Sequence, residues 1–280
     1  MRLATIRTDA GTRAVKVESD RLVDLGANDV GAFLSATGWR ERAEVAQGTS
    51  YPLENAVFAP LVPQPSKVVC VGLNYRTHIQ EMGRDLPEYP TLFSKFAETL
   101  IGATDDIRRP AETEAFDWEV ELAVVIGSSV RRAAIADAEA AIAGFTVLND
   151  ITCRDWQFRT REWLQGKNWE ATTPVGPYLV TPDELPGGVR PVCEVRLTVD
   201  GEQMQCDTTG DLLFDPVALV EYVSTMIRLN PGDIIATGTP GGVGHARKPE
   251  RYLVGGETVV AEIDGIGRLT NRISPTARPV

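Results

Sequence analysis

Residues 116–127 read FDWEVELAVVIG, and the apolar second half of this run suits only the interior of a β-sheet. Side chains alternate between the two faces of a strand, so Glu119 and Glu121 share one face, while Val120, Leu122 and Val124 share the other. Two neighbouring carboxylates repel each other. A bound divalent cation would compensate this most directly, because hard cations take carboxylate oxygens. The alternative is a strand end with two solvated glutamates.

The composition is that of an ordinary globular protein, with 43% hydrophobic and 24% charged residues among 280. This length accommodates one large domain or one domain with a small appendage. No apolar run approaches the roughly 18 residues of a membrane span, and the first residues lack the apolar core of a signal peptide. We therefore expect a cytoplasmic protein without membrane contact.

The net charge of −11 argues against nucleic acid as a partner, because a polyanion would be repelled. A small anion can still bind where a metal and a few cations concentrate positive charge. The four cysteines lack metal-ligand or redox spacing, which predicts buried thiols. With only two histidines, His78 and His245, the candidates for an imidazole base are few.

Residues 1–65 are predicted to form a small N-terminal α+β domain that ends in a proline-rich linker. In residues 66–280 strands far outnumber helices, and no regular βαβ alternation is present. An alanine-rich helix is expected over 133–143, closed by Gly144. The expected fold class is therefore α+β and mostly β.

A third carboxylate, Asp150, follows the expected strand 145–149. Three carboxylates and waters suit Mg²⁺, Mn²⁺ or Ca²⁺, whereas zinc would favour imidazole or thiolate. The alternative is an ordinary turn residue at a strand end.

His78 and Glu81 lie three positions apart, so one helical turn would bring them together. A glutamate that orients a histidine makes a general base able to activate water. A solvated polar pair on a loop is the competing interpretation.

Arg154 and Gln157 follow Asp150 at helical spacing, and Lys167 adds a further cation. Their convergence on a metal would suit an enolisable keto acid. Alternatively, the arginines of this segment form a solvated helix face paired with neighbouring acidic residues.

The glycine-rich segment 237–244 resembles an anion cradle, because glycines let backbone N–H groups point at an oxyanion. It lacks the spacing of a nucleotide-binding loop. No Gly-x-Ser-x-Gly element is present either, which disfavours a covalent hydrolase mechanism.

A series of short motifs follows in order from about residue 66 to the C-terminus, and none would suffice alone. The series comprises Gly72-Leu73-Asn74-Tyr75 with His78-Ile79-Gln80-Glu81, Glu119-Val120-Glu121-Leu122, Asn149-Asp150-Ile151-Thr152-Cys153-Arg154-Asp155, Gly166-Lys167 with Pro174-Val175-Gly176-Pro177, Pro231-Gly232-Asp233, and Thr237-Gly238-Thr239-Pro240 with Gly242-Val243-Gly244. As an ordered set these motifs resemble the fumarylacetoacetate hydrolase family.

The resemblance implies a mixed β-roll or sandwich catalytic domain that forms a homodimer, with Mg²⁺ or Mn²⁺ on Glu119, Glu121 and Asp150. The metal would chelate the carboxylate and keto oxygens of a pyruvoyl-type substrate. The other roles that the resemblance implies are water activation by His78 and Glu81 on a lid, oxyanion stabilisation by Lys167, Arg154 and Gln157, and substrate binding by Tyr75, Gly238 and Thr239. The segment Lys167-Asn168-Trp169-Glu170 departs from the family, because relatives commonly have a small residue and an aspartate there, so the pocket beside Lys167 is expected to differ in shape.

Hydrolysis needs a base that delivers water, and the His–Glu pair provides one. We therefore predict hydrolysis of an acylpyruvate, with fumarylpyruvate as the best guess, to pyruvate and a carboxylic acid. Oxaloacetate-type decarboxylation and hydroxymuconate-type isomerisation or decarboxylation are alternatives on the same scaffold, and a non-catalytic ligand-binding protein is a remote one. His245 is interpreted as a loop residue that lines the site or supports structure, because nothing pairs with it in sequence.

Overall fold

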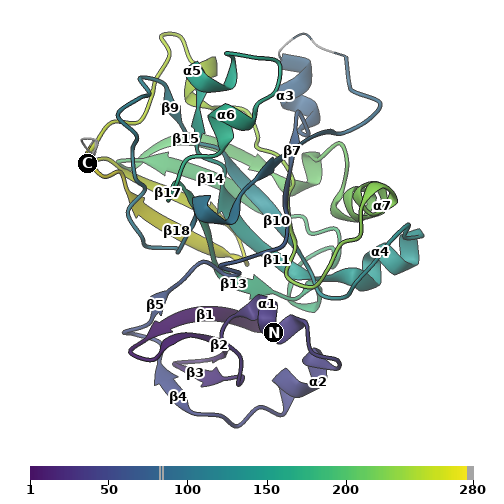
Figure 1. Cartoon of the computed structure of the whole chain (residues 1–280). Helices are drawn as coiled ribbons and strands as arrows, with labels where there is room; N and C mark the ends of the chain where they lie inside the picture. The colour runs from purple at the N-terminus through teal and green to yellow at the C-terminus, as the bar shows by residue number, and fades with distance from the viewer. Residues whose placement is uncertain (82, 84, 276–280) are drawn as a thin grey trace.

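The computed structural model describes residues 1–81, 83 and 85–275, apart from the side chain of Glu81. Two sheets dominate the described chain (Figure 1). The strands are β1 (Arg2–Thr8), β2 (Gly11–Glu18), β3 (Arg21–Asp24), β4 (Ser50–Pro52), β5 (Val57–Phe58), β6 (Val68–Gly72), β7 (Thr91–Lys95), β8 (Leu100–Ile101), β9 (Phe116–Asp117), β10 (Val120–Ile126), β11 (Ile142–Asn149), β12 (Thr152–Cys153), β13 (Thr173–Val180), β14 (Glu194–Val199), β15 (Glu202–Thr208), β16 (Ile234–Ala236), β17 (Thr258–Ile263) and β18 (Gly267–Arg272).

The helices are short and few. They are α1 (Val30–Leu34), α2 (Trp39–Glu44), α3 (Arg76–Glu81), α4 (Ile135–Ala141), α5 (Arg154–Gln157), α6 (Leu164–Lys167) and α7 (Pro216–Met226). The mostly β, α+β class expected from the sequence is confirmed. No helix of the described residues is long and apolar enough to cross a membrane.

The larger sheet has twelve strands along the path β4-β3-β2-β1-β13-β11-β10-β16-β6-β7, with β5 and β8 paired at its side. The smaller sheet runs β15-β14-β17-β18 and packs across β10 and β11, with the main hydrophobic core between the two sheets. Helices α3, α5 and α6 lie at the end of the molecule remote from β2–β4 (Figure 1).

The N-terminal strands continue the large sheet. Leu3 of β1 lies opposite Leu179 of β13, and both belong to one buried cluster with Phe33 and Trp39 of the first two helices. Residues 1–65 therefore share a core with the rest of the chain. The boundary at residue 65 stays a prediction.

Two expected elements differ in the structure. Residues 116–127 are two strands, because the Trp118 N–H donates to the Asp117 carboxylate and the Glu119 N–H donates to the Asn149 side chain. The alanine-rich helix ends at Ala141, and Gly144 lies inside β11. A Cβ at Gly144 would lie 2.2 Å from the Val180 carbonyl oxygen, so close strand packing here overrides local helix propensity.

The shared core makes a testable prediction. Leu179→Ala removes a fully buried side chain and is expected to lower the free energy of unfolding by about 2–5 kcal/mol. Hydrogen exchange is expected to accelerate in β1 and β2 together with β13. Val192→Ala, at a 55% exposed site, is the control and should change neither quantity. Unchanged protection of β1 and β2 in Leu179→Ala would show that the N-terminal strands are stabilised independently.

Candidate active site

Strand pairing brings the three predicted carboxylates together. Strands β10 and β11 are antiparallel with Val120 opposite Asn149, so Glu119 and Asp150 are neighbours where the two strands begin and end. The Asp150 N–H donates to the Glu119 carbonyl oxygen at 2.8 Å. One oxygen from each of Glu119, Glu121 and Asp150 lies within 4.8 Å of the others, and all three side chains are buried.

Two buried lysines compensate part of this negative charge. Lys167 Nζ lies 2.8 Å from Glu119 Oε2 and 2.7 Å from Asp150 Oδ2. Lys95, at the end of β7, places its Nζ 2.7 Å from Asp150 Oδ1 and donates to the Ile151 carbonyl at 3.1 Å. Lys167 was predicted as a site residue and Lys95 was not.

Arg154 links the carboxylates to a fourth buried acid. Its Nη2 lies 2.7 Å from Glu119 Oε1, and its Nε donates to Asp117 Oδ2 at 2.8 Å. Its Nη1 donates to Gln157 Oε1 at 2.9 Å across the single turn of α5. The predicted helical placement of Arg154 and Gln157 on one side is therefore observed. Asp150 was expected on the same helical turn, but strand β12 separates it from α5.

Glu121 differs from its two neighbours. Among the ion pairs of the described residues, Glu119 and Asp150 have two each and Glu121 has none. Its Oε2 accepts from the Gly238 N–H at 2.8 Å. Burial, followed by the charges of Asp150 and Glu119, raises the pKa of Glu121 well above its usual 4.5.

Asp150 shows the opposite balance. Burial is the largest single influence and would raise its pKa, but the charges and hydrogen bonds of Lys167 and Lys95 together outweigh it and lower the pKa. Among the described residues, Glu121 is therefore the carboxylate of the cluster without an ion pair, and the charge of Lys167 does not outweigh its burial and its acidic neighbours. An all-carboxylate donor set of this kind fits a hard divalent ion such as Mg²⁺ or Mn²⁺.

Glu119 and Glu121 of the triad line a pocket of about 250 Å³. Its wall includes the aromatic rings of Phe93 and Trp163, which meet edge to face at 5.5 Å. A Cβ at Gly72 would lie 2.3 Å from Trp163, so glycine is required for this indole to pack against β6. The other lining residues include Val71, Leu73, His78, Arg154, Gln157, Phe158, Lys167, Thr239, Val243, His245 and Ala246.

Three of the predicted residues lie elsewhere or are otherwise engaged. Tyr75 is fully buried in the main core and does not line this pocket. Gly238 directs its N–H at Glu121. Glu81 is the last residue of α3, and its side chain lies outside the described part, so its pairing with His78 stays a prediction.

Sequence reasoning missed three residues that hold the site in shape. Asp117 accepts from Arg154, and Lys95 pairs with Asp150. Gln205 of β15 donates to Thr239 Oγ1 at 2.8 Å and accepts from the Val120 N–H at 3.1 Å. Asp117 stood inside the quoted run 116–127, where the sequence could have suggested a further acid of the site. Nothing in the sequence around Lys95 or Gln205 pointed to the site.

The residues that follow Lys167 pack away from the pocket, and the expected difference in shape from relatives stays a prediction. Asn168 bridges to β7, where its Oδ1 accepts from the Phe96 N–H at 2.7 Å and its Nδ2 donates to the Ser94 carbonyl at 3.0 Å. Trp169 packs edge to face on Trp156 at 5.0 Å. Neither Asn168 nor Trp169 lines the pocket.

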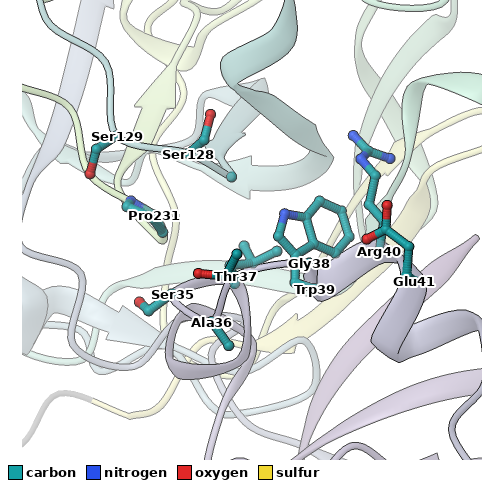
Figure 2. A pocket seen from close by; sticks show the side chains of 12 residues that line it. Ser35, Ala36, Thr37, Gly38, Trp39, Arg40, Glu41, Ser128, Ser129 and Pro231 are labelled. Atoms are coloured by element: carbon teal, nitrogen blue, oxygen red, sulfur yellow. The ribbon is translucent and has the colours of Figure 1, made fainter.

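A second hollow, of about 440 Å³, lies between the N-terminal helices and the loop after β10. Ser128, Ser129 and Pro231 line one side and residues 35–41 the other (Figure 2). The Arg40 guanidinium lies over the Trp39 ring at 4.4 Å. None of the carboxylates of the triad reaches this hollow, so it is distinct from the candidate active site.

The family model for the fumarylacetoacetate (FAA) hydrolase C-terminal region matches residues 67–274. The chain belongs to the fumarylacetoacetate hydrolase family. It is 41% identical over 235 residues to a mitochondrial oxaloacetate tautomerase of Rattus norvegicus, covering 83% of this chain and 74% of that protein.

Two solved structures of similar proteins bear on the chemistry. A 5-carboxymethyl-2-hydroxymuconate delta-isomerase from Mycobacterium smegmatis has a TM-score of 0.82 at 31% identity, covering 99% of this chain and 100% of that one. A maleylpyruvate hydrolase from Sphingobium sp., in complex with manganese(II) and pyruvate, has a TM-score of 0.81 at 28% identity with the same coverage. The buried acidic triad and this manganese-containing relative together support divalent metal binding.

The raised pKa of Glu121 predicts how metal binding depends on pH. Neutral Glu121 stabilises the metal-free protein at low pH, and this contribution is lost as the pH rises through the raised pKa. Mn²⁺ pairs with the charged form, so the increase in Tm on adding Mn²⁺ is expected to grow as the pH rises from 4.5 through that raised pKa. Thermal unfolding with and without Mn²⁺ across this range measures it.

Glu121→Gln is the matching variant, because it keeps the shape and removes the charge. We expect Mn²⁺ affinity to fall by more than about tenfold, with the pH dependence flattened. Glu202→Gln, at an exposed hairpin residue, is the control. Wild-type Mn²⁺ affinity in Glu121→Gln would exclude Glu121 as a ligand.

Proposed function

We propose that the protein catalyses keto–enol interconversion of a 2-oxo dicarboxylic acid, with oxaloacetate as the substrate. The observation that carries the proposal is a small pocket lined by Lys167, His78 and two carboxylates of the buried triad. This arrangement suits the formation of an enolate next to a chelated keto acid. The relatives named oxaloacetate tautomerases, including the rat protein at 41% identity, support the choice of reaction and substrate.

Glu119, Glu121 and Asp150 would hold Mg²⁺ or Mn²⁺, which when bound polarises the keto oxygen and chelates the adjacent carboxylate. The chain itself supplies further positive charge, because three buried cations face four buried acids, Asp117 and the triad. With all of these groups charged, the cluster is negative. A bound divalent ion makes its net charge positive, which favours an anionic substrate.

Lys167 acts in the proposal as a hydrogen-bond donor. Burial would lower the pKa of Lys167, but the neighbouring charges of Asp150 and Glu119 outweigh it and raise the pKa above its usual value. An ammonium that stays charged cannot serve as a base. It can donate to the oxygen on which negative charge develops as the enolate forms.

His78 moves the proton. Enolisation takes a proton from C3 of the substrate and delivers one to the keto oxygen, and no bond to water forms. His78 lines the pocket from α3, and an imidazole both accepts and returns a proton near neutral pH. Tautomerisation therefore needs only groups of the described pocket together with the metal.

Acylpyruvate hydrolysis, the reaction predicted from the sequence, is the second candidate. It begins with the same substrate chelation and adds a water that His78 and Glu81 would activate. The aromatic wall of Phe93, Phe158 and Trp163 favours it, because such a wall can pack against an acyl chain. The similarity to a maleylpyruvate hydrolase also supports it.

Parallel assays separate the two candidates. With Mg²⁺ or Mn²⁺ present, we expect rapid loss of the ultraviolet absorbance of oxaloacetate enol, abolished by a chelator and restored by metal. Pyruvate release from fumarylpyruvate is expected to be much slower. Rapid pyruvate release without tautomerisation would favour the hydrolase, and inactivity of the metal-loaded protein in both assays would contradict both.

His78→Ala tests the proton carrier. We expect kcat for tautomerisation to fall by roughly 10²–10⁴, because general acid–base catalysis contributes about this much. Mn²⁺ affinity should be unchanged, since His78 is outside the carboxylate triad. Gln80→Ala, on the exposed side of the same helix, is the matched control. Wild-type turnover in His78→Ala would assign the proton transfer to another group.

A further inference from the structure

We propose that His245 is the specificity-determining residue that binds the distal carboxylate of the substrate. This inference rests on the proposed function and extends it to the far end of the pocket. His245 lines the same pocket as Glu119, Glu121 and His78. Residues from three parts of the chain contact it.

The backbone at His245 is anchored to the active site. The N–H groups of Gly244 and His245 donate to the two carboxylate oxygens of Asp117 at 2.7 and 3.0 Å. The same carboxylate accepts from Arg154. A Cβ at Gly244 would lie 1.8 Å from the Arg251 carbonyl oxygen, so this approach requires glycine. Asp117 thereby fixes the distance between His245 and the guanidinium beside the triad.

Two aromatic rings lie near the imidazole ring. Its centroid lies 5.2 Å from that of Phe158, which also lines the pocket, and 6.4 Å from that of Tyr252 on the adjoining loop. Leu253 ties this loop back to the core, because its N–H donates to the Phe116 carbonyl at 2.7 Å. The aromatic contact with Phe158 thus joins the imidazole to the pocket wall.

A hydrogen-bonded chain orients the two ring nitrogens. The Tyr252 hydroxyl donates to Glu250 Oε2 at 2.8 Å, and its oxygen lies 2.8 Å from His245 Nδ1. Since that hydroxyl proton is given to Glu250, the tyrosine oxygen accepts from Nδ1–H. Nε2 lies on the opposite edge of the ring and is directed away from Tyr252.

This geometry suits an anion at Nε2. When Nε2 carries a proton, Glu250, 3.5 Å from Nδ1, balances the imidazolium charge from behind and the substrate carboxylate balances it from the front. Lys167 and Arg154 are already paired with the carboxylate cluster. Among the described lining residues, His245 is the remaining group besides His78 that can offer a charged donor to a second carboxylate.

Two four-carbon acids test the inference, because oxaloacetate and 2-oxobutanoate differ at the distal end by a carboxylate against a methyl group. Their Kd values for the Mn²⁺-loaded protein are measured by titration calorimetry in wild type, His245→Phe and His245→Gln. His245→Phe keeps a ring against Phe158 and removes both nitrogens. We expect oxaloacetate binding to weaken by roughly tenfold or more in both variants, with 2-oxobutanoate changed by less than about twofold.

Tyr252→Phe examines the orienting chain, because it keeps the aromatic ring and removes the hydroxyl that accepts from Nδ1. We expect the affinity for oxaloacetate to fall by less than in the His245 variants, and the affinity for 2-oxobutanoate to stay unchanged. Unchanged Mn²⁺ affinity in each variant confirms that the site is folded. If the His245 variants lost affinity equally for both acids, or lost none for oxaloacetate, the proposed role of His245 would be overturned. Failure of the wild-type protein to bind either acid would instead contradict the proposed function.

Discussion

Seven buried charged side chains around one pocket impose the constraint on which the rest of this structure depends. They are Asp117, Glu119, Glu121, Asp150, Lys95, Arg154 and Lys167. Buried charges are tolerated only when each has well-placed partners, and removal of one partner leaves another uncompensated. The short contacts of Lys95, Arg154 and Lys167 meet this requirement for every acid except Glu121. That exception is the physical reason for assigning a cation to the site.

Local chemistry made part of this structure predictable. The apolar run after Glu119 predicted a strand in the sheet interior, and residues 120–126 form the buried strand β10. Arg154 and Gln157 were placed by helical spacing alone. Each of these features involves residues within a few positions of one another, where propensity and periodicity carry information.

Long-range pairing could not be predicted in the same way. Asp150 meets Glu119 only because β10 and β11 pair in one register, and Lys95 meets Asp150 across 55 positions. Close packing of β11 on β13 overrode the helical propensity of the alanines before Gly144. His245 had no periodic partner in sequence, because the loop that brings Tyr252 to it is irregular.

The most direct test of the central claim is the electron paramagnetic resonance spectrum of the Mn²⁺-loaded protein with oxalate enriched in oxygen-17. Oxalate offers the two chelating oxygens of a 2-oxo acid. If the triad holds a metal that chelates the substrate, the manganese lines are expected to broaden with labelled oxalate relative to unlabelled oxalate. Lines broadened by labelled water but unaffected by labelled oxalate would contradict the account.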